Sequence, residues 1–164
     1  MSGSRLLRRT LSRLLHLWFR MSRGLTLGVR AAVLDGEGRV FLVRHTYMPG
    51  WQLPGGGVER GETALGALAR ELAEEAGLAL AGPPVLHGIV HQGDVSPADH
   101  VLVYVVREVR TLATRRPALE IADRGFFPLS DLPPGTTAGT RARLAEIAAG
   151  APAAPTWSAS VPPG

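Results

Sequence analysis

Three glutamates lie within five residues of one another on a predicted helix, and this cluster constrains the fold more than any other feature. Residues 62–76 have the apolar spacing of a helix, and Gly77 is a natural stop. Glu71, Glu74 and Glu75 fall at offsets 0, 3 and 4, which places their carboxylates on one helix face. Because carboxylates so close together repel one another, this face needs either solvent or cations around it.

Two interpretations of the acidic face are open from its spacing alone. It can be an ordinary solvated helix face, or it can bind a metal ion. An all-oxygen cluster suits a hard divalent ion, Mg²⁺ or Mn²⁺, rather than zinc. Proteins usually hold Mg²⁺ with few carboxylates and complete its coordination with water and substrate phosphates, so the second interpretation points to phosphate chemistry. The chain has no Cys, which excludes thiolate metal sites, disulfides and cysteine nucleophiles.

The surrounding residues favour the metal-binding interpretation. The segment 56–78 matches the pattern G-x5-E-x7-R-E-U-x-E-E-x-G-U, where U is a bulky apolar residue. Every position is filled, by Gly56, Glu62, Arg70, Glu71, Leu72, Glu74, Glu75, Gly77 and Leu78. This pattern resembles the signature of the Nudix hydrolases, the family of the MutT-like pyrophosphohydrolases. The resemblance runs from about Thr26 to Leu144 and includes a segment, 125–133, that follows the motif.

The resemblance implies a fold, a reaction and a set of roles. The fold would be a Nudix-type α/β/α sandwich around a mixed β-sheet. The reaction would be Mg²⁺-dependent hydrolysis of a nucleoside diphosphate linked to another group, with Mn²⁺ as a substitute metal. Glu71, Glu74 and Glu75 would bind the metal, and Arg70 and Glu62 would hold the loop and helix in shape.

A general base must take a proton from the attacking water. In the family that base is a carboxylate of the motif or one on a later loop. The later candidate here is Glu120, six residues before Phe126, because its position resembles the loop glutamate of members that cleave deoxynucleoside triphosphates. Asp123 and Asp99 are weaker candidates, and an ordinary exposed loop acid is the alternative interpretation of Glu120.

Several residues are candidates for substrate contact. Gly55 and Gly56 would let the backbone approach phosphates closely. Arg44 ends a predicted strand and could meet a phosphate, and Trp51 could stack on a base, although a surface role and a core role are their respective alternatives. Further stacking candidates are Tyr47, Phe126 and Phe127, and the histidines at 45, 87, 91 and 100 share no metal-ligand spacing.

The substrate is less constrained than the reaction. The window 93–96 lacks the Pro of ADP-ribose members and the Tyr of dinucleoside-polyphosphate members, and no coenzyme A signature is visible. This leaves nucleoside or deoxynucleoside triphosphates, which Glu120 slightly favours, and nucleotide sugars. A non-catalytic nucleotide-sensing module on the same fold is the alternative function, although such modules are expected to lose the carboxylates that this motif keeps.

The remaining pattern predicts an α+β fold with a mixed sheet. Strands at 26–34 and 39–45 flank the turn signal Asp35-Gly36-Glu37-Gly38 and look like a hairpin. Further strands are expected at 51–53, 86–91, 100–109 and 125–129, and a final helix at 137–149.

Charge divides the chain into three parts. Seven of the 18 basic residues precede Asp35, whereas residues 35–164 hold 11 Arg and all 14 acids. We therefore expect a basic amphipathic helix over 1–24, a Nudix domain over 25–149 and a disordered Pro- and Ala-rich tail over 150–164. Residues 5–23 have three open roles: packing on the domain or on a second copy in a homodimer, weak contact with a membrane surface, or targeting. A mildly acidic body argues against binding of duplex DNA or RNA, and we expect a cytoplasmic protein.

Overall fold

A computed structural model describes residues 24–93, 96–113 and 119–158. Strands and helices alternate irregularly along these residues, as the sequence pattern predicts. In chain order the elements are β1 (Thr26–Val33), β2 (Arg39–His45), β3 (Trp51–Gln52), α2 (Ala64–Glu71), a π-helical turn (Leu72–Ala76), β4 (Leu78–Leu80), β5 (Val85–His91), β6 (Asp99–Val106), β7 (Val109–Thr111), β8 (Ile121–Pro128) and α3 (Ala138–Ala149).

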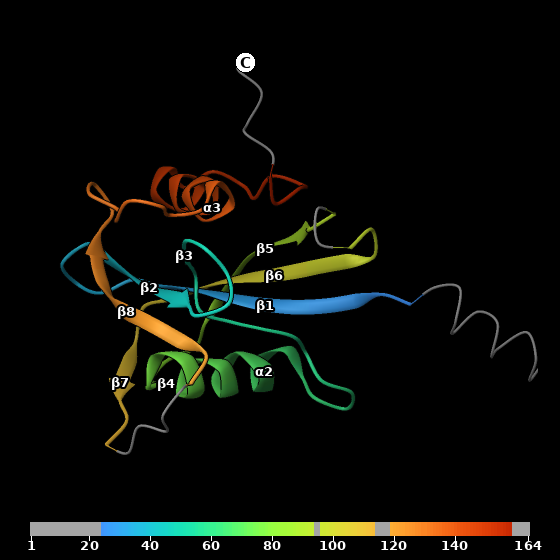
Figure 1. Ribbon diagram of the computed structural model, residues 1–164, viewed down its shortest axis with the longest axis horizontal. Helices are drawn as coiled ribbons and strands as arrows, with labels where there is room; N and C mark the ends of the chain where they lie inside the picture. The colour runs from blue at the N-terminus through green and yellow to red at the C-terminus, as the bar shows by residue number, and fades with distance from the viewer. Residues whose placement is uncertain (1–23, 94–95, 114–118, 159–164) are drawn as a thin grey trace, which may run out of the picture.

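Two three-stranded sheets form the middle layer of the molecule. One has the order β1-β6-β5, with β1 parallel to β6 and β5 antiparallel to β6. The other, β3-β2-β8, is antiparallel, and β4 and β7 form a short separate pair. Helix α2 lies on one side of the strands and α3 on the other (Figure 1). The predicted α+β sandwich around a mixed sheet is therefore confirmed.

Each central strand buries both of its faces. In β1, Val29 and Val33 pack toward α2 with Leu68, whereas Ala32 packs toward α3 with Leu144. The same alternation divides β2 between the two cores. Because successive side chains point to opposite faces, a strand with helices on both sides has a continuous apolar run in place of alternation. That is the pattern of residues 26–34.

The predicted hairpin of 26–34 with 39–45 is wrong. The two segments share only the isolated bridge between Leu34 and Val40, beside the turn. Beyond it the strands diverge, β1 pairing with β6 and β2 with β8. The turn residues correctly predicted that the chain reverses its direction. With a helix on each side of the sheets, however, pairing with distant strands is more favourable than pairing with the next strand in the sequence.

The predicted disordered tail over 150–164 also differs from the structure. The backbone of His91 donates to the Pro155 carbonyl at 2.9 Å and accepts from the Trp157 N–H at 2.9 Å. Ala153 and Trp157 pack on the core beneath α3. Proline and alanine carry little apolar pattern, so the sequence did not reveal this packing. Residues 159–164 lie outside the described residues. The helix predicted over 1–24 also lies outside them, apart from its last residue, Gly24.

No helix in the described part of the chain is both long enough and apolar enough to span a bilayer.

Candidate active site

The acidic residues lie where α2 changes its winding. Thr63 caps the helix by accepting from the Gly66 N–H at 3.0 Å, and Leu68 is buried in the core. The helix then continues as a π-turn over Leu72–Ala76, which carries two of the three glutamates. Gly77 ends it in the left-handed region with φ 68°. The predicted helix is therefore present, but its last turn is wider than α-helical spacing assumes.

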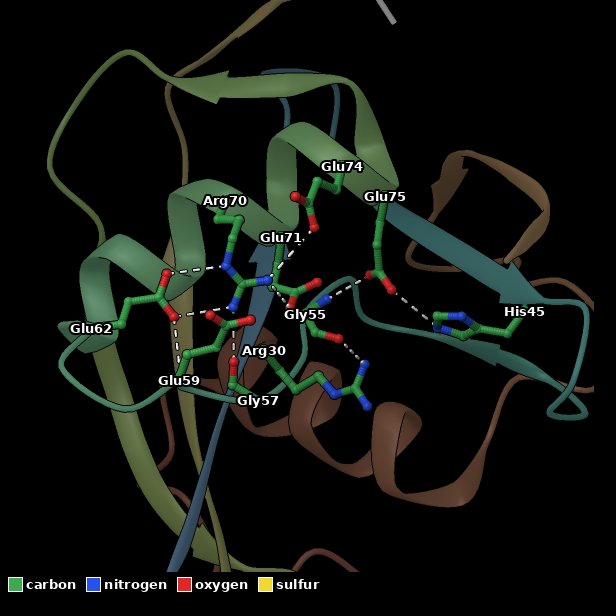
Figure 2. A network of polar contacts seen from close by, with 10 residues as sticks. All are labelled: Arg30, His45, Gly55, Gly57, Glu59, Glu62, Arg70, Glu71, Glu74 and Glu75. Carbon is green, nitrogen blue, oxygen red and sulfur yellow. Dashed lines mark hydrogen bonds and ion pairs between the residues drawn. The ribbon is translucent and has the colours of Figure 1, made fainter. Parts of the chain in front are cut away.

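The glycine-rich loop lies against the acidic face (Figure 2). The Gly55 N–H donates to Oε2 of Glu75 at 2.8 Å. Gly55 has φ 143°, and a Cβ there would overlap the carbonyl of Val29 in β1. A Cβ at Gly56 would overlap the carboxylate of Glu71. Both positions need glycine because the loop backbone is wedged between a strand and two carboxylates.

Glu75 is the buried acid of the site. Its side chain is 13% exposed, and burial raises its pKa to about 7. The Gly55 N–H and the positive charge of Arg30 oppose this rise, whereas the charges of Glu71 and Glu120 add to it. The raised pKa of Glu75 therefore reflects burial first, with a smaller contribution from the neighbouring carboxylates.

Arg70 braces the loop and the helix, as the resemblance implies. Its guanidinium donates to both carboxylate oxygens of Glu62, at 3.0 and 3.1 Å, and this lowers the pKa of Glu62. The same group donates to the Gly57 carbonyl at 2.9 Å and to Oε1 of Glu71 at 2.7 Å. Glu74 is more loosely held, at 3.6 Å from Arg70, with its side chain 44% exposed.

Two neighbours of Glu75 were missed by the sequence reasoning. Arg30, from β1, donates to the carbonyls of Leu53 and Gly55 at 3.0 and 2.8 Å. His45, at the end of β2, places Nε2 3.4 Å from Oε1 of Glu75, and its burial lowers its pKa. A lone Arg inside an apolar strand was a usable signal for Arg30, whereas His45 has no comparable signal.

Family comparison agrees with this geometry. A family model described as NUDIX domain matches residues 24–147. The chain belongs to the NUDIX family. A solved MutT NUDIX hydrolase from Burkholderia pseudomallei is 30% identical, with a TM-score of 0.64 over 74% of this chain and 97% of that one. A NUDIX hydrolase from Nitrosomonas europaea, 22% identical over 78% of this chain and 91% of that one, shares the fold with a TM-score of 0.65.

Curated relatives match a shorter stretch. A protein of Dinoroseobacter shibae named RNA pyrophosphohydrolase is 45% identical over 60 residues, which are 35% of this chain and 38% of that protein. One of the same name from Halorhodospira halophila is 46% identical over 65 residues, which are 40% of this chain and 36% of that protein. The chain therefore aligns with little more than a third of these relatives' length.

Glu120 reaches the Nudix motif from a distant part of the sequence. It precedes β8, and its carbonyl accepts from the Thr46 N–H at 2.9 Å, just beyond the end of β2. Its negative charge adds to the rise in the pKa of Glu75 and opposes the fall in the pKa of His45. Of the weaker base candidates, Asp123 pairs with Arg44 at 3.5 Å and Asp99 accepts from Thr26 at 2.8 Å.

Trp51 lies in the core, which favours the structural interpretation over base stacking. It is 8% exposed, and its ring meets that of Phe127 edge-on at 4.7 Å. Arg44 lies over the same ring at 5.4 Å. Phe126 packs likewise on Phe41. Among the predicted stacking residues, Tyr47 is the one that is largely exposed, at 64%.

The donor set of the Nudix site fits a hard divalent cation. Glu71 and Glu75 converge on one short backbone segment, and their mutual repulsion helps to raise the pKa of Glu75. A dication would relieve that repulsion, and all the donors are carboxylate oxygens. Within the described residues no three such side chains already converge as a metal site, since Arg70 draws Glu71 and Glu74 toward itself. The histidines form no metal set there either.

Two hollows flank this centre. A groove of about 300 Å³ lies between the glycine loop and the start of β1 and β6; its lining includes Arg30, Gln52, Gly56, Gly57, Gln92 and Asp99. A more open hollow of about 650 Å³ is lined by 44–50 and Ala122. Met48 lines both hollows. The groove adjoins Gly56, which lies against the Glu71 carboxylate, whereas the open hollow adjoins His45, the neighbour of Glu75.

Proposed function

We propose that this chain is a Mg²⁺-dependent Nudix pyrophosphohydrolase that cleaves a pyrophosphate bond in a nucleotide, with a nucleoside triphosphate as the favoured substrate. The observation that carries the proposal is the buried Glu75 carboxylate, held by the Gly55 N–H beside Glu71 with only partial charge compensation. Strongly perturbed carboxylates of this kind gather at functional sites, and a bound cation would supply the missing positive charge.

Each residue has a separate task in this proposal. Glu71, Glu74 and Glu75 hold the metal, with Mn²⁺ as a substitute for Mg²⁺. When bound, the metal neutralises phosphate oxygens and lowers the pKa of a bound water. Arg70 orients the Glu71 carboxylate through the bond at 2.7 Å. Arg30 fixes the glycine loop by its bonds to Leu53 and Gly55.

The general base is proposed to be Glu120 or a carboxylate of the motif. Glu120 is favoured because its charge acts on Glu75 while it stands outside the helix that would hold the metal. Its neighbour His45 is buried with a lowered pKa, so it is mainly neutral near pH 7 and does not neutralise Glu120.

The groove beside Gly56 and Arg30 is proposed to take the nucleoside. Its walls carry the amides of Gln52 and Gln92, which are suited to base or sugar recognition. Nucleotide sugars remain candidates alongside triphosphates. A second candidate is the triphosphate end of an RNA, because relatives named RNA pyrophosphohydrolase match 35% and 40% of this chain. Nucleotide sensing without cleavage is the non-enzymatic alternative.

A release assay with Mg²⁺ tests these proposals. The panel holds ribo- and deoxynucleoside triphosphates, oxidised deoxynucleoside triphosphates, nucleotide sugars, ADP-ribose, dinucleoside polyphosphates and a short RNA with a 5′-triphosphate. Wild type is run beside Glu75→Gln, with Arg39→Gln as a control, because Arg39 pairs with Asp35 at the start of β2 and the variant leaves the motif carboxylates intact. Turnover of one class that collapses in Glu75→Gln supports the proposal. Nucleotide binding without any turnover would replace it with the sensing function.

A further inference from the structure

The chain segment 151–157, called here the C-terminal strap, joins α3 to the end of β5. It leaves α3 after Gly150 and runs beside β5, where the bridge of Thr156 with His91 adds it to the sheet edge. Ala153 lies against Gly88, since a Cβ at Gly88 would overlap the Ala153 methyl group. The strap therefore covers the part of edge strand β5 that faces α3.

Buried charges hold the strap on the α3 side. Arg143, fully buried, donates to the Thr156 carbonyl at 3.0 Å and to Oε1 of Glu146 at 2.6 Å. That same oxygen accepts from the Ala154 N–H at 3.1 Å. The Trp157 ring packs where a Cβ at Gly139 would be and faces Arg143 at 6.0 Å. The pyrophosphatase chemistry proposed above uses none of these groups.

His91 connects the strap to the substrate groove. Both of its backbone polar groups bond to the strap, and its ring Nε2 lies 3.2 Å from the Pro97 carbonyl in the β5–β6 connection. The next residue, Gln92, bonds through its N–H to the Asp99 carbonyl at 2.8 Å. Gln92 and Asp99 form part of the groove wall, together with Gly56 and Gly57.

We infer that the C-terminal strap is a positioning element for nucleotide binding, which holds the Gln92 and Asp99 wall of the groove in place through His91. The inference rests on the proposed function in one respect, that the groove takes the nucleoside. The hydrogen bonds of the strap go to α3 and to His91 rather than to the motif glutamates or to Gln92 and Asp99. Its effect should therefore fall on substrate affinity and leave the chemical step nearly unchanged.

Two variants of the full chain loosen the strap from opposite sides. Gly88→Ala places a methyl group against Ala153, and Trp157→Ala removes the packing on α3. Neither leaves a buried charge without its partner, so both should fold. Val33→Ala is the matched control, because Val33 is buried in the other core at the far end of β1. It lowers stability without touching the strap.

Hydrogen exchange and steady-state kinetics are measured on all four proteins. We expect the amides of Gln92, Asp99 and His100 to exchange at least about tenfold faster in both strap variants and not in the control. We expect KM for the preferred nucleotide to rise about fivefold or more, with kcat within about twofold of wild type. Unchanged exchange at these amides, or a fall in kcat at constant KM, would overturn the inference.

The two proposals fail in different ways. If wild type turns over no substrate, the proposed activity fails, and the Kd of the nucleoside triphosphate measured by calorimetry takes the place of KM. Weaker binding in both strap variants, with faster exchange, would then still support the positioning role. Equal Kd in all four proteins would overturn it.

Discussion

Two charged clusters are buried in the molecule, one around Glu75 beside α2 and one around Arg143 and Glu146 on α3, and they differ in how their charges are balanced. Around Arg143, each charge has a partner: Glu146 accepts from Arg143 and Ala154 and lies 3.1 Å from His87. Burial works to raise the pKa of Glu146, but the bonds from His87 and Ala154 and the charge of Arg143 lower it overall. Around Glu75, the effects of burial and of the neighbouring acids outweigh those of Arg30 and the Gly55 N–H, so the pKa of Glu75 is raised.

This difference separates a cluster that holds the fold together from one that serves chemistry. A compensated cluster keeps its groups ionised and ties together the segments it joins, here α3, β5 and the strap, so that removing one partner leaves an uncompensated buried charge. An under-compensated cluster costs stability in the folded state and gives a site that attracts cations. Substitutions that break one cluster and spare the other test the distinction.

The largest effect is expected from Glu75→Gln on activity. The amide keeps the shape of the side chain and can accept from the Gly55 N–H, but it loses the negative charge. We expect kcat to fall by about 10²–10³-fold, or about 3–4 kcal/mol of transition-state stabilisation. Pyrophosphate release at saturating substrate and Mg²⁺ measures this. A loss below tenfold would remove Glu75 from the metal site.

Arg143→Met should give the next largest effect, a loss of stability, with any change in activity confined to KM because Arg143 also holds the strap. It leaves Glu146 buried without its cation, so we expect the free energy of unfolding to fall by about 3 kcal/mol. Urea unfolding measures the loss. In the double variant with Glu146→Gln the loss should be smaller than the sum of the two single losses, because the variants remove one shared interaction. Additive losses would contradict a compensated cluster.

A third effect concerns stability against pH without metal. The pKa of Glu75 is about 7 when folded against an ordinary 4.5, so the folded state retains a proton that the unfolded state has lost. Stability should therefore fall as pH rises from about 5 to 7.5, by roughly 2–3 kcal/mol, and stay flat above. Melting curves in a chelator measure it. Glu75→Gln should lack this slope and be the more stable protein at pH 8.

Added Mg²⁺ sharpens the same comparison. At pH 8 it should raise the melting temperature of wild type and leave that of Glu75→Gln nearly unchanged, because the metal supplies the missing positive charge. An equal rise in both proteins would place the metal elsewhere.

The smallest effect is expected from Arg44→Gln. Its ion pair with Asp123 spans 3.5 Å between side chains that are 48% and 53% exposed, so we expect less than about 0.5 kcal/mol of lost stability. A KM raised severalfold for the preferred nucleotide would instead assign Arg44 to phosphate binding, as the sequence predicts. Urea unfolding and steady-state kinetics on one preparation distinguish the two.

Local sequence patterns predicted local structure well. The helix with its glutamates and most strands follow from spacing, caps and turn residues, all within short stretches of chain. The bonds of Arg70 to Glu62 and Glu71 agree with what the family resemblance implies. The short strands β4 and β7 were not predicted as a pair, since each has only three residues. The π-turn was missed because its residues are ordinary helix formers.

By itself, the sequence determined the family, because the contiguous residues 56–78 fill every position of its signature. It also determined the acidic face, because helical spacing brings Glu71, Glu74 and Glu75 to one side of a helix. Tertiary structure alone decided that Arg30, His45 and Glu120 surround Glu75, that Trp51 is buried, and that the strap reaches His91. These contacts join segments far apart in the chain. Their pairing is selected by burial on both faces of the strands, which no local pattern encodes.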